Sequence, residues 1–257
     1  MEKEFLNKIR RLNWVLSQST AGSLSYDELS KLLSEVINTN FYIIDRKGFV
    51  LAGAYTDAAD KTTFHDELGF EKIPESDNYN ILQIEKTEAN LIGEELSAYF
   101  GESYALKDKY HTLVPAVCGG ERFGTILLAK HQTPCTEEEI VLAEYGAALV
   151  GLELQRNEQR ALEIEKGRHM AVEIGMFTLS NSEKDAIEKI LDEMKDEEEG
   201  TIVASKLARE YGLTNSVIVS ALKKLESAGI LEAKSLGMKG THIKILNPYI
   251  KEKTRKW

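Results

Sequence analysis

The sequence predicts an α+β protein: an antiparallel sheet flanked by helices, then a long helix, then a smaller domain in which helices precede a hairpin. Three observations support this prediction. Apolar residues recur at spacings of three or four near both ends of the chain, as in helices that bury one face. Two pairs of strand-like apolar runs are each joined by a turn that contains glycine, which predicts two hairpins. About forty residues without proline join the two parts, and helices of that length usually connect domains or mediate dimers.

The first part of the chain is predicted to contain two helices and two hairpins. Residues 5–16 and 26–37 have the apolar spacing of helices, whereas residues 57–109 are mixed and polar, which favours short helices and loops. Strands are expected at residues 40–44, 49–52, 110–118 and 122–129. The order helix, hairpin, variable loops, hairpin, helix is typical of ligand-sensing domains of the GAF or PAS kind.

Two capping boxes divide the second half of the chain. Thr136 with Glu139 predicts the start of the long helix, which is expected to run to about Leu179. Ser180 with Glu183 predicts the start of the next helix. We therefore expect a sensor domain over residues 1–155, a linker or dimerisation helix over residues 136–179 and a second domain over residues 180–257.

The second domain has the pattern of a winged helix-turn-helix. Residues 201–211 are predicted to form a short helix with Val203, Leu207 and Ala208 facing inward, and Gly212 suits the left-handed conformation that ends it. Thr214 is a suitable N-cap for a second helix, whose apolar residues 218, 221, 222 and 225 have core spacing. Residues 230–236 and 241–245 would form the hairpin, or wing. This arrangement places the second helix in the major groove of DNA.

The charge distribution supports a nucleic-acid partner. Residues 201–257 hold 11 Lys and Arg against 4 Asp and Glu, a net charge of +7, and the remainder holds 21 against 38, a net charge of −17. Such asymmetry is expected of a nucleic-acid-binding part on an acidic body. Part of the excess has another explanation, a solvated basic tail, because four of these charges lie at Lys251, Lys253, Arg255 and Lys256.

The candidate contacts to double-stranded DNA are polar and basic side chains of this domain. Asn215 and Ser216 begin the second helix, where they would reach base edges, and asparagine can pair with adenine through two hydrogen bonds. Lysines, with Lys239 at the wing tip, would contact phosphates. A module that binds another protein is the alternative interpretation. The full set is Ser205, Thr214, Asn215, Ser216, Ser220, Lys223, Lys224, Lys234, Lys239 and His242.

Several motifs resemble the CodY family, the GTP- and branched-chain-amino-acid-sensing global repressors of low-GC Gram-positive bacteria. In the second domain they are VASK at residues 203–206, SVIV at 216–219, LESAG at 225–229 and SLGMKGT at 235–241. Further motifs are GGER at residues 119–122, LAEYGA at 142–147 and VGLE at 150–153. The resemblance covers both ends and the long helix, and it is poor between about residues 54 and 110.

The resemblance implies a GAF sensor domain, a linker helix and a winged helix-turn-helix, acting as a homodimer, with a tetramer as the alternative. The N-terminus lacks a signal peptide, so the protein is expected to stay in the cytoplasm. Such proteins mainly repress genes of nutrient limitation and amino-acid metabolism. It also implies GTP as one effector, bound near the first hairpin and the start of the long helix. The matching positions are Asp45, Arg46, Lys47 and Glu153. Arg46 and Lys47 suit phosphate, although an exposed basic turn is often only solvated, and Asp45 would repel phosphate.

The second implied effector is isoleucine, leucine or valine, bound in the GAF pocket. The family holds the ligand carboxylate with an arginine, a charge-assisted pairing. No arginine lies between Arg46 and Arg122, and Lys61 near the matching position lacks the two-pronged geometry of a guanidinium. Phe64, Tyr99 and Phe100 are candidate pocket residues that equally suit an ordinary core.

Composition and motifs favour a protein without catalytic, cofactor or metal sites. At 257 residues with 42% apolar and 29% charged residues, the chain is an ordinary soluble globular protein, with no apolar run long enough for a membrane span and no signal peptide. Residues 119–125 lack the Lys-Ser/Thr ending of a P-loop, and the five histidines and two cysteines have no metal spacing. A sensor attached to an enzyme would need a catalytic domain after residue 180, where fewer than 80 residues remain. The other alternative is a GAF protein that responds to a different small ligand.

Overall fold

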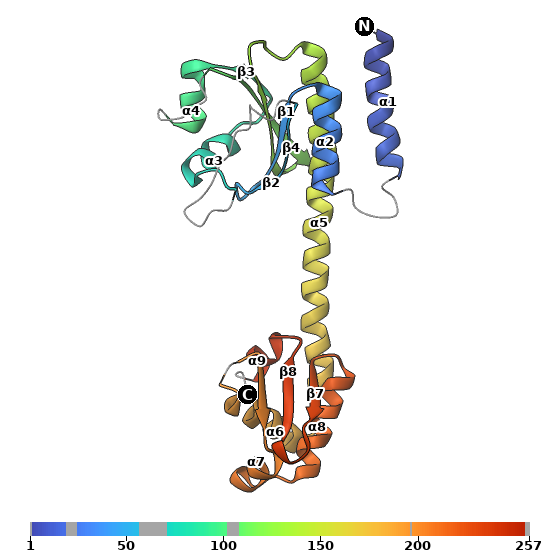
Figure 1. Ribbon diagram of the computed structural model, residues 1–257, viewed down its shortest axis with the longest axis vertical. Helices are drawn as coiled ribbons and strands as arrows, with labels where there is room; N and C mark the ends of the chain where they lie inside the picture. Colours follow the sequence, from blue (N-terminus) through green and yellow to red (C-terminus); the bar gives the residue numbers. More distant parts are fainter. Residues whose placement is uncertain (1, 19–24, 57–70, 102–107, 196, 255–257) are drawn as a thin grey trace. The chain divides into compact units, whose positions relative to one another are not determined.

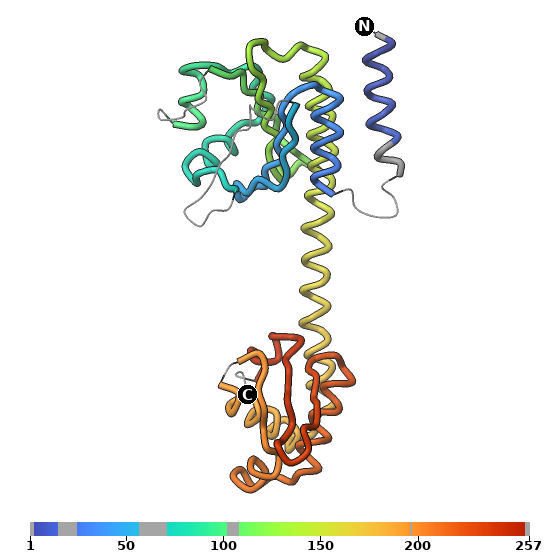
Figure 2. The backbone as a smooth tube through the Cα atoms, viewed as in Figure 1, coloured from blue at the N-terminus to red at the C-terminus, as the bar shows by residue number. Residues whose placement is uncertain are grey.

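The computed structural model describes residues 2–18, 25–56, 71–101, 108–195 and 197–254, shown as a ribbon in Figure 1. They form two compact units, residues 1–159 and residues 160–257. Helix α5 (Glu137–Phe177) contributes residues to both units, and its backbone can be followed without interruption in Figure 2. Among the described residues, no helix has the length and hydropathy needed to cross a bilayer. The predicted fold class is confirmed.

A five-stranded antiparallel sheet organises the N-terminal unit, with strand order β2-β1-β5-β4-β3. The four predicted strands are present within two residues of their expected ends. The fifth, β3, lies in the segment expected to hold only helices and loops, and that expectation was wrong. Within the described residues it pairs with β4, through Glu88 and Leu91, and Asn90 interrupts the register with φ 58°. The strands are β1 (Asn40–Asp45), β2 (Val50–Ala54), β3 (Glu88–Leu91), β4 (Tyr110–Cys118) and β5 (Glu121–Lys130).

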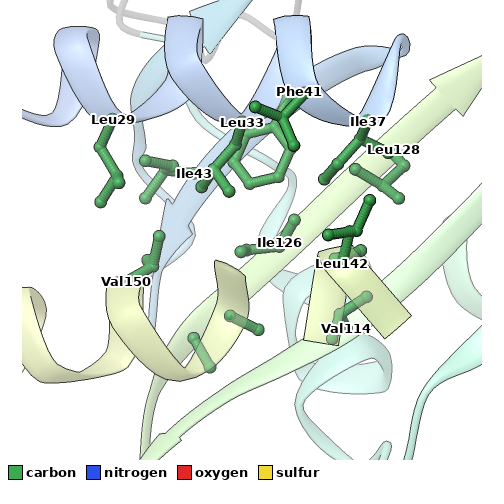
Figure 3. Close-up of a cluster of buried hydrophobic side chains, with 14 of the residues drawn as sticks. Leu29, Leu33, Ile37, Phe41, Ile43, Val114, Ile126, Leu128, Leu142 and Val150 are labelled. Atoms are coloured by element: carbon green, nitrogen blue, oxygen red, sulfur yellow. The ribbon is translucent and has the colours of Figure 1, made fainter. Parts of the chain in front are cut away.

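Helices cover both faces of this sheet. The helices α1 (Glu2–Gln18) and α2 (Tyr26–Ile37) and the first turns of α5 bury one face, where Leu29, Leu33 and Val150 meet strand residues such as Ile43 and Ile126 (Figure 3). Full burial of each such side chain contributes roughly 1.5–3 kcal/mol. The other face is covered by α3 (Glu75–Leu82), the 3₁₀ turn η3 (Gly93–Leu96) and α4 (Ser97–Phe100).

The C-terminal unit is built on a three-stranded sheet, with strand order β6-β8-β7. Its core joins apolar residues of all its helices with Val172 and Met176 from the end of α5. Gly175 of α5 permits this packing, because a Cβ atom there would collide with Ile230. The elements are α6 (Asn181–Glu193), β6 (Glu199–Ile202), α7 (Ala204–Tyr211), α8 (Asn215–Ser227), β7 (Leu231–Ser235), the 3₁₀ turn η4 (Gly237–Lys239), β8 (Thr241–Ile245) and α9 (Tyr249–Thr254).

Three details of the C-terminal unit differ from the sequence prediction. The helix expected over residues 201–211 begins only at Ala204, because Thr201 and Ile202 pair with β8. Ile202 therefore fills the core, and Val203 is 42% exposed instead of facing inward. The basic segment near the C-terminus is not merely a solvated tail, since α9 buries Ile250 and Thr254.

The middle of α5 lies outside both cores. Between Leu154 and Val172 no residue of the helix is buried. From Glu165 onward a few polar contacts to the C-terminal unit appear: the Tyr249 hydroxyl donates to Glu165 at 2.8 Å, and the Asn247 amide donates to the Arg168 carbonyl at 2.9 Å. This stretch of helix thus has little apolar packing of its own.

Candidate nucleic-acid interface and effector sites

The turn between α7 and α8 has the local geometry that the sequence predicts. Gly212 has φ 68°, which is left-handed backbone, and its N–H donates to the Ala208 carbonyl. The Thr214 hydroxyl accepts a hydrogen bond from the Val217 N–H at 3.3 Å and so caps α8. The predicted core residues of α8 are buried, and this fixes which face of the helix points outward. Asn215 and Ser216 are exposed on that outer face.

A surface groove of about 640 Å³ runs along the outer face of α8. It is lined by two lysines, three serines, one threonine and one valine, and none of these lining residues carries a negative charge. DNA phosphates are attracted to such a surface. The lining residues are Thr178, Ser216, Val219, Ser220, Lys223, Lys224 and Ser227.

Two of the predicted DNA contacts, Ser220 and Lys224, are engaged within the protein. The Ser220 hydroxyl and the Lys224 ammonium each donate to the carboxylate of Glu183 at 2.7 Å, and Lys224 also donates to the Thr178 carbonyl at 3.1 Å. Hydrogen bonds from Lys224, then Ser220, then the Ser180 N–H lower the pKa of Glu183 to about 2, against burial, which raises it. This cluster attaches α8 to the start of α6. A role for Ser220 or Lys224 at DNA stays a prediction.

The wing presents the remaining basic candidates. Lys234 and Lys239 are exposed, and His242 is half-buried with Nδ1 3.4 Å from the Thr201 hydroxyl. Lys234 stands directly opposite His242 in the hairpin register. Ser205 is exposed in the first turn of α7, which directly follows the strand that pairs with β8. The predicted residues of α7, α8 and the wing therefore belong to one small unit.

A pocket of about 260 Å³ in the N-terminal unit lies at the positions proposed for GTP. Leu51, Phe123 and Leu154 form apolar walls, and the Asn157 amide donates to the Tyr26 hydroxyl at 2.6 Å. Burial, followed by the charges of Glu153 and Asp45, raises the pKa of Tyr26, whereas the Asn157 hydrogen bond lowers it. The lining residues are Tyr26, Asp45, Arg46, Lys47, Leu51, Phe123, Leu154, Asn157 and Glu158.

Glu153 lies beside this pocket, next to Leu154 and one helical turn before Asn157. It is 2% exposed, and its Oε1 accepts a hydrogen bond from Arg156 at 2.9 Å. Its Oε2 is buried and has no hydrogen-bond partner among the residues that the structure describes. A buried carboxylate oxygen without a partner is costly unless a ligand or water supplies a donor.

The arginine of the basic turn beside the pocket is already paired with carboxylates. Arg46 forms ion pairs with Glu121, at 2.9 Å, and with Glu158. Asp45 does not point its charge into open space, because Oδ1 accepts the backbone N–H groups of Lys47 and Phe49 at 2.9 and 2.8 Å. Asp45 thus holds the turn, and Arg46 must exchange partners before it can bind phosphate.

Only half of the predicted amino-acid site falls in the described residues. Lys61 and Phe64 lie outside them. Phe100 is buried in the core between the sheet and α3 and α4, and Tyr99 packs against the same core. Burial, then the charges of Glu88 and Glu95, raises the pKa of Tyr99. These contacts fit either a pocket wall or ordinary core, so a ligand role for Tyr99 and Phe100 stays a prediction.

Arg122 is a partly buried cation whose partners the sequence did not predict. It donates to the carbonyl of Leu82, the last residue of α3, at 3.3 Å, to the Ile84 carbonyl just after that helix, and to the Thr125 hydroxyl at 2.8 Å. Burial lowers its pKa to about 10. Its guanidinium therefore fixes the end of α3 to β5.

Two family models match this chain: the CodY GAF-like domain over residues 4–178 and the CodY helix-turn-helix domain over residues 198–257. The chain belongs to the CodY family. Relatives named "Global transcriptional regulator CodY" from Clostridium acetobutylicum and Clostridium tetani are 40% and 42% identical to it, over 98% of this chain and 98% of each relative. The solved cofactor-binding GAF domain of the nutrient sensor CodY from Clostridium difficile is 35% identical, with a TM-score of 0.46, and covers 58% of this chain and 96% of that domain.

In this CodY-family chain, the sequence did not predict most of the residues that line the pocket beside Glu153, nor the carboxylates that pair with Arg46. Glu121 and Glu158 lie 75 and 112 residues from Arg46 along the chain. One signal was available: Asn157 follows Glu153 by four residues, so both side chains fall on the same face of a helix.

Proposed function

We propose that this chain is a transcriptional regulator, mainly a repressor, that binds double-stranded operator DNA through its C-terminal unit. The observation that supports this most directly is the outer face of α8, where Asn215, Ser216 and Lys223 are exposed above a fully buried apolar face. A helix with short polar side chains at its start fits the major groove, and nearby lysines neutralise phosphates. The family match of the helix-turn-helix domain supports the same conclusion.

We propose further that the protein acts as a homodimer whose DNA affinity is raised by GTP and by a branched-chain amino acid. Two recognition helices would then read half-sites about 34 Å apart. An effector raises DNA affinity only if it binds the DNA-competent arrangement more tightly. Helix α5 belongs to both units and is the element through which such a preference would pass.

The pocket beside Glu153 fits the base of a guanine nucleotide. Leu51, Phe123 and Leu154 line the pocket and would hold the flat faces of the base. Glu153 is not a lining residue, so its side chain would have to turn toward the pocket for the buried Oε2 to accept hydrogen bonds from the guanine N1–H and 2-amino group. Adenine lacks both donors. At about 260 Å³ the pocket is slightly smaller than the roughly 300–1,000 Å³ of typical ligand sites, so the phosphates would lie outside, beside Arg46 and Lys47.

The proposal for isoleucine, leucine or valine rests on family membership and on the apolar core around Phe100. The proposed regulated genes, those of nutrient limitation and amino-acid metabolism, rest on family membership alone. We assign no catalytic role to any residue in these proposals.

The deciding experiment measures duplex binding by fluorescence anisotropy, using a duplex that the full chain selects from a randomised library. GTP and isoleucine are added singly and together, with ATP and lysine as matched controls. We expect each effector to raise affinity and the controls to leave it unchanged. Absence of duplex binding at low ionic strength would overturn the proposed function, and binding that ignores both effectors would overturn the sensing part only.

A further inference from the structure

The tip of the wing carries an apolar side chain that packs against nothing. Met238 is fully exposed, more than any other large apolar residue of the described chain, and Leu236 beside it is 41% exposed. Single exposed apolar side chains are common on protein surfaces. This one differs because the surrounding backbone holds it outward.

The backbone of the tip is closed by hydrogen bonds and seated on the domain. The Leu236 N–H donates to the Gly240 carbonyl at 2.8 Å, and the Gly240 N–H donates to the Gly237 carbonyl at 3.2 Å. Gly240 has φ 107°, and a Cβ atom there would clash with the Ile202 carbonyl. Only glycine suits this conformation and this close approach. The methionine is therefore presented by a defined turn.

Two lysines lie close to the exposed methionine in the sequence. Lys239 is adjacent, Lys234 is exposed four residues earlier, and no acidic residue occurs between Ala233 and Thr241. In Figure 1 this turn lies at the same end of the C-terminal unit as the turn that precedes α8. The contact of Gly240 with Ile202, two residues before α7, agrees with that placement. An apolar point between basic side chains matches the minor groove, whose phosphate edges flank sugar and base surfaces.

From these observations we infer that Met238, supported by Leu236, enters the minor groove next to the segment read by α8 and acts as an apolar wedge at one base step. Lys234 and Lys239 bind the phosphates on its two sides. Apolar wedges of this kind partly unstack a base step and kink the duplex. Because pyrimidine–purine steps unstack most easily, the wedge gives sequence preference without a hydrogen bond to a base. The inference rests on the proposed DNA-binding function.

The test uses the full chain and a duplex selected from a randomised library, with 2-aminopurine placed in turn at each flanking step. Wild-type protein should raise 2-aminopurine fluorescence at one step, and Met238→Ala should abolish that rise. Met238→Ala should also weaken binding about tenfold, the loss expected when a buried methionine contact disappears. Its salt dependence should stay that of wild type, whereas Lys239→Ala should reduce the slope of log K against log salt by about 0.9.

A second arm identifies the groove. Replacing G·C by inosine·cytosine at the flanking step removes the 2-amino group from the minor groove and leaves the major-groove edge unchanged. The affinity of the wild-type protein for the duplex should change on this replacement, whereas the affinity of Met238→Ala should stay the same. Thermal unfolding should be the same for both proteins, because the side chain is exposed.

The outcomes separate the two proposals. If wild type binds no duplex, the proposed function fails. If wild type binds and Met238→Ala equals it in affinity, in 2-aminopurine signal and in response to inosine, the wedge alone is wrong and the exposed tip serves another partner, such as a protein.

Discussion

Two buried glutamates, one in each unit, lie beside the two candidate binding surfaces and differ in their hydrogen bonding. Glu183, 5% exposed, accepts hydrogen bonds on both carboxylate oxygens, from Ser220 and Lys224, and its pKa falls to about 2. Glu153, 2% exposed, satisfies one oxygen through Arg156 and leaves the other without a partner. A complete set of partners is what a structural ion pair requires. An incomplete set in a buried place leaves a position for a donor from a ligand or from a water molecule.

The largest expected effect tests the surface beside Glu183. Ser216→Glu places a negative charge where α8 would meet the bases, so specific DNA binding should fall to the non-specific level, a loss of at least about 1,000-fold. GTP and isoleucine binding to the N-terminal unit should be unchanged. Anisotropy titration measures the first and calorimetry the second. The matched control is Ser182→Glu, an exposed position in the first turn of α6, which should retain DNA binding. Full DNA affinity of Ser216→Glu would contradict the groove placement.

The second prediction concerns Glu183 as a structural residue. Glu183→Ala removes the acceptor of Lys224, Ser220 and the Ser180 N–H, and should destabilise the C-terminal unit by about 2 kcal/mol. Urea unfolding and hydrogen exchange of α6 and α8 measure this. Glu188→Ala is the control: it removes a half-exposed ion pair with Lys189 on the same helix and should change stability by less than about 0.5 kcal/mol.

The same variant gives a pH test. Folding lowers the pKa of Glu183 from its ordinary 4.5 to about 2. Its contribution to stability is therefore complete above pH 4.5 and is lost as pH falls toward 2. The stability difference between wild type and Glu183→Ala should shrink between about pH 5 and about pH 3. A difference that stays constant over this range would show that the carboxylate is not bound as described.

The third prediction concerns Glu153 as a ligand residue. Glu153→Gln keeps the shape of the side chain but removes the charge that would accept the guanine N1–H and amino group, so GTP affinity should fall about tenfold or more. Inosine triphosphate, which lacks the amino group, should bind wild type more weakly than GTP, and the variant should lose that preference. Equal calorimetric affinities of the two proteins for GTP would remove Glu153 from the site.

The smallest expected effect tests whether Arg46 binds the phosphates of GTP. Glu158→Gln removes one of the two carboxylates paired with this arginine, which should free it for phosphate and raise GTP affinity about threefold. Glu144→Gln, also on α5 but hydrogen-bonded to Thr87, is the control and should leave affinity unchanged. A weaker GTP affinity of Glu158→Gln would mean that Glu158 itself contacts the nucleotide.

The contrast between the two glutamates also separates what the sequence predicts from what it cannot. Local signals were sufficient for the capping boxes at Thr136 and Ser180, for the turn at Gly212 and for the buried face of α8. The four-residue strands β3 and β6 were missed because such short segments are strands only through pairing with distant residues, as Glu199–Ile202 pair with Thr241–Lys244. The missing partner of Glu153 is likewise invisible in sequence, since it depends on what surrounds one oxygen atom in space.

The exposed middle of α5 determines where the chain is expected to unfold locally first. Helices in proteins owe most of their stability to the packing of an apolar face, and the stretch between Leu154 and Val172 contributes no buried residue to either core. Its helical turns persist because both ends are anchored. Amide hydrogens there should exchange through local fraying at a far lower free energy than those of the cores, and a protease should cut there first once either anchor melts.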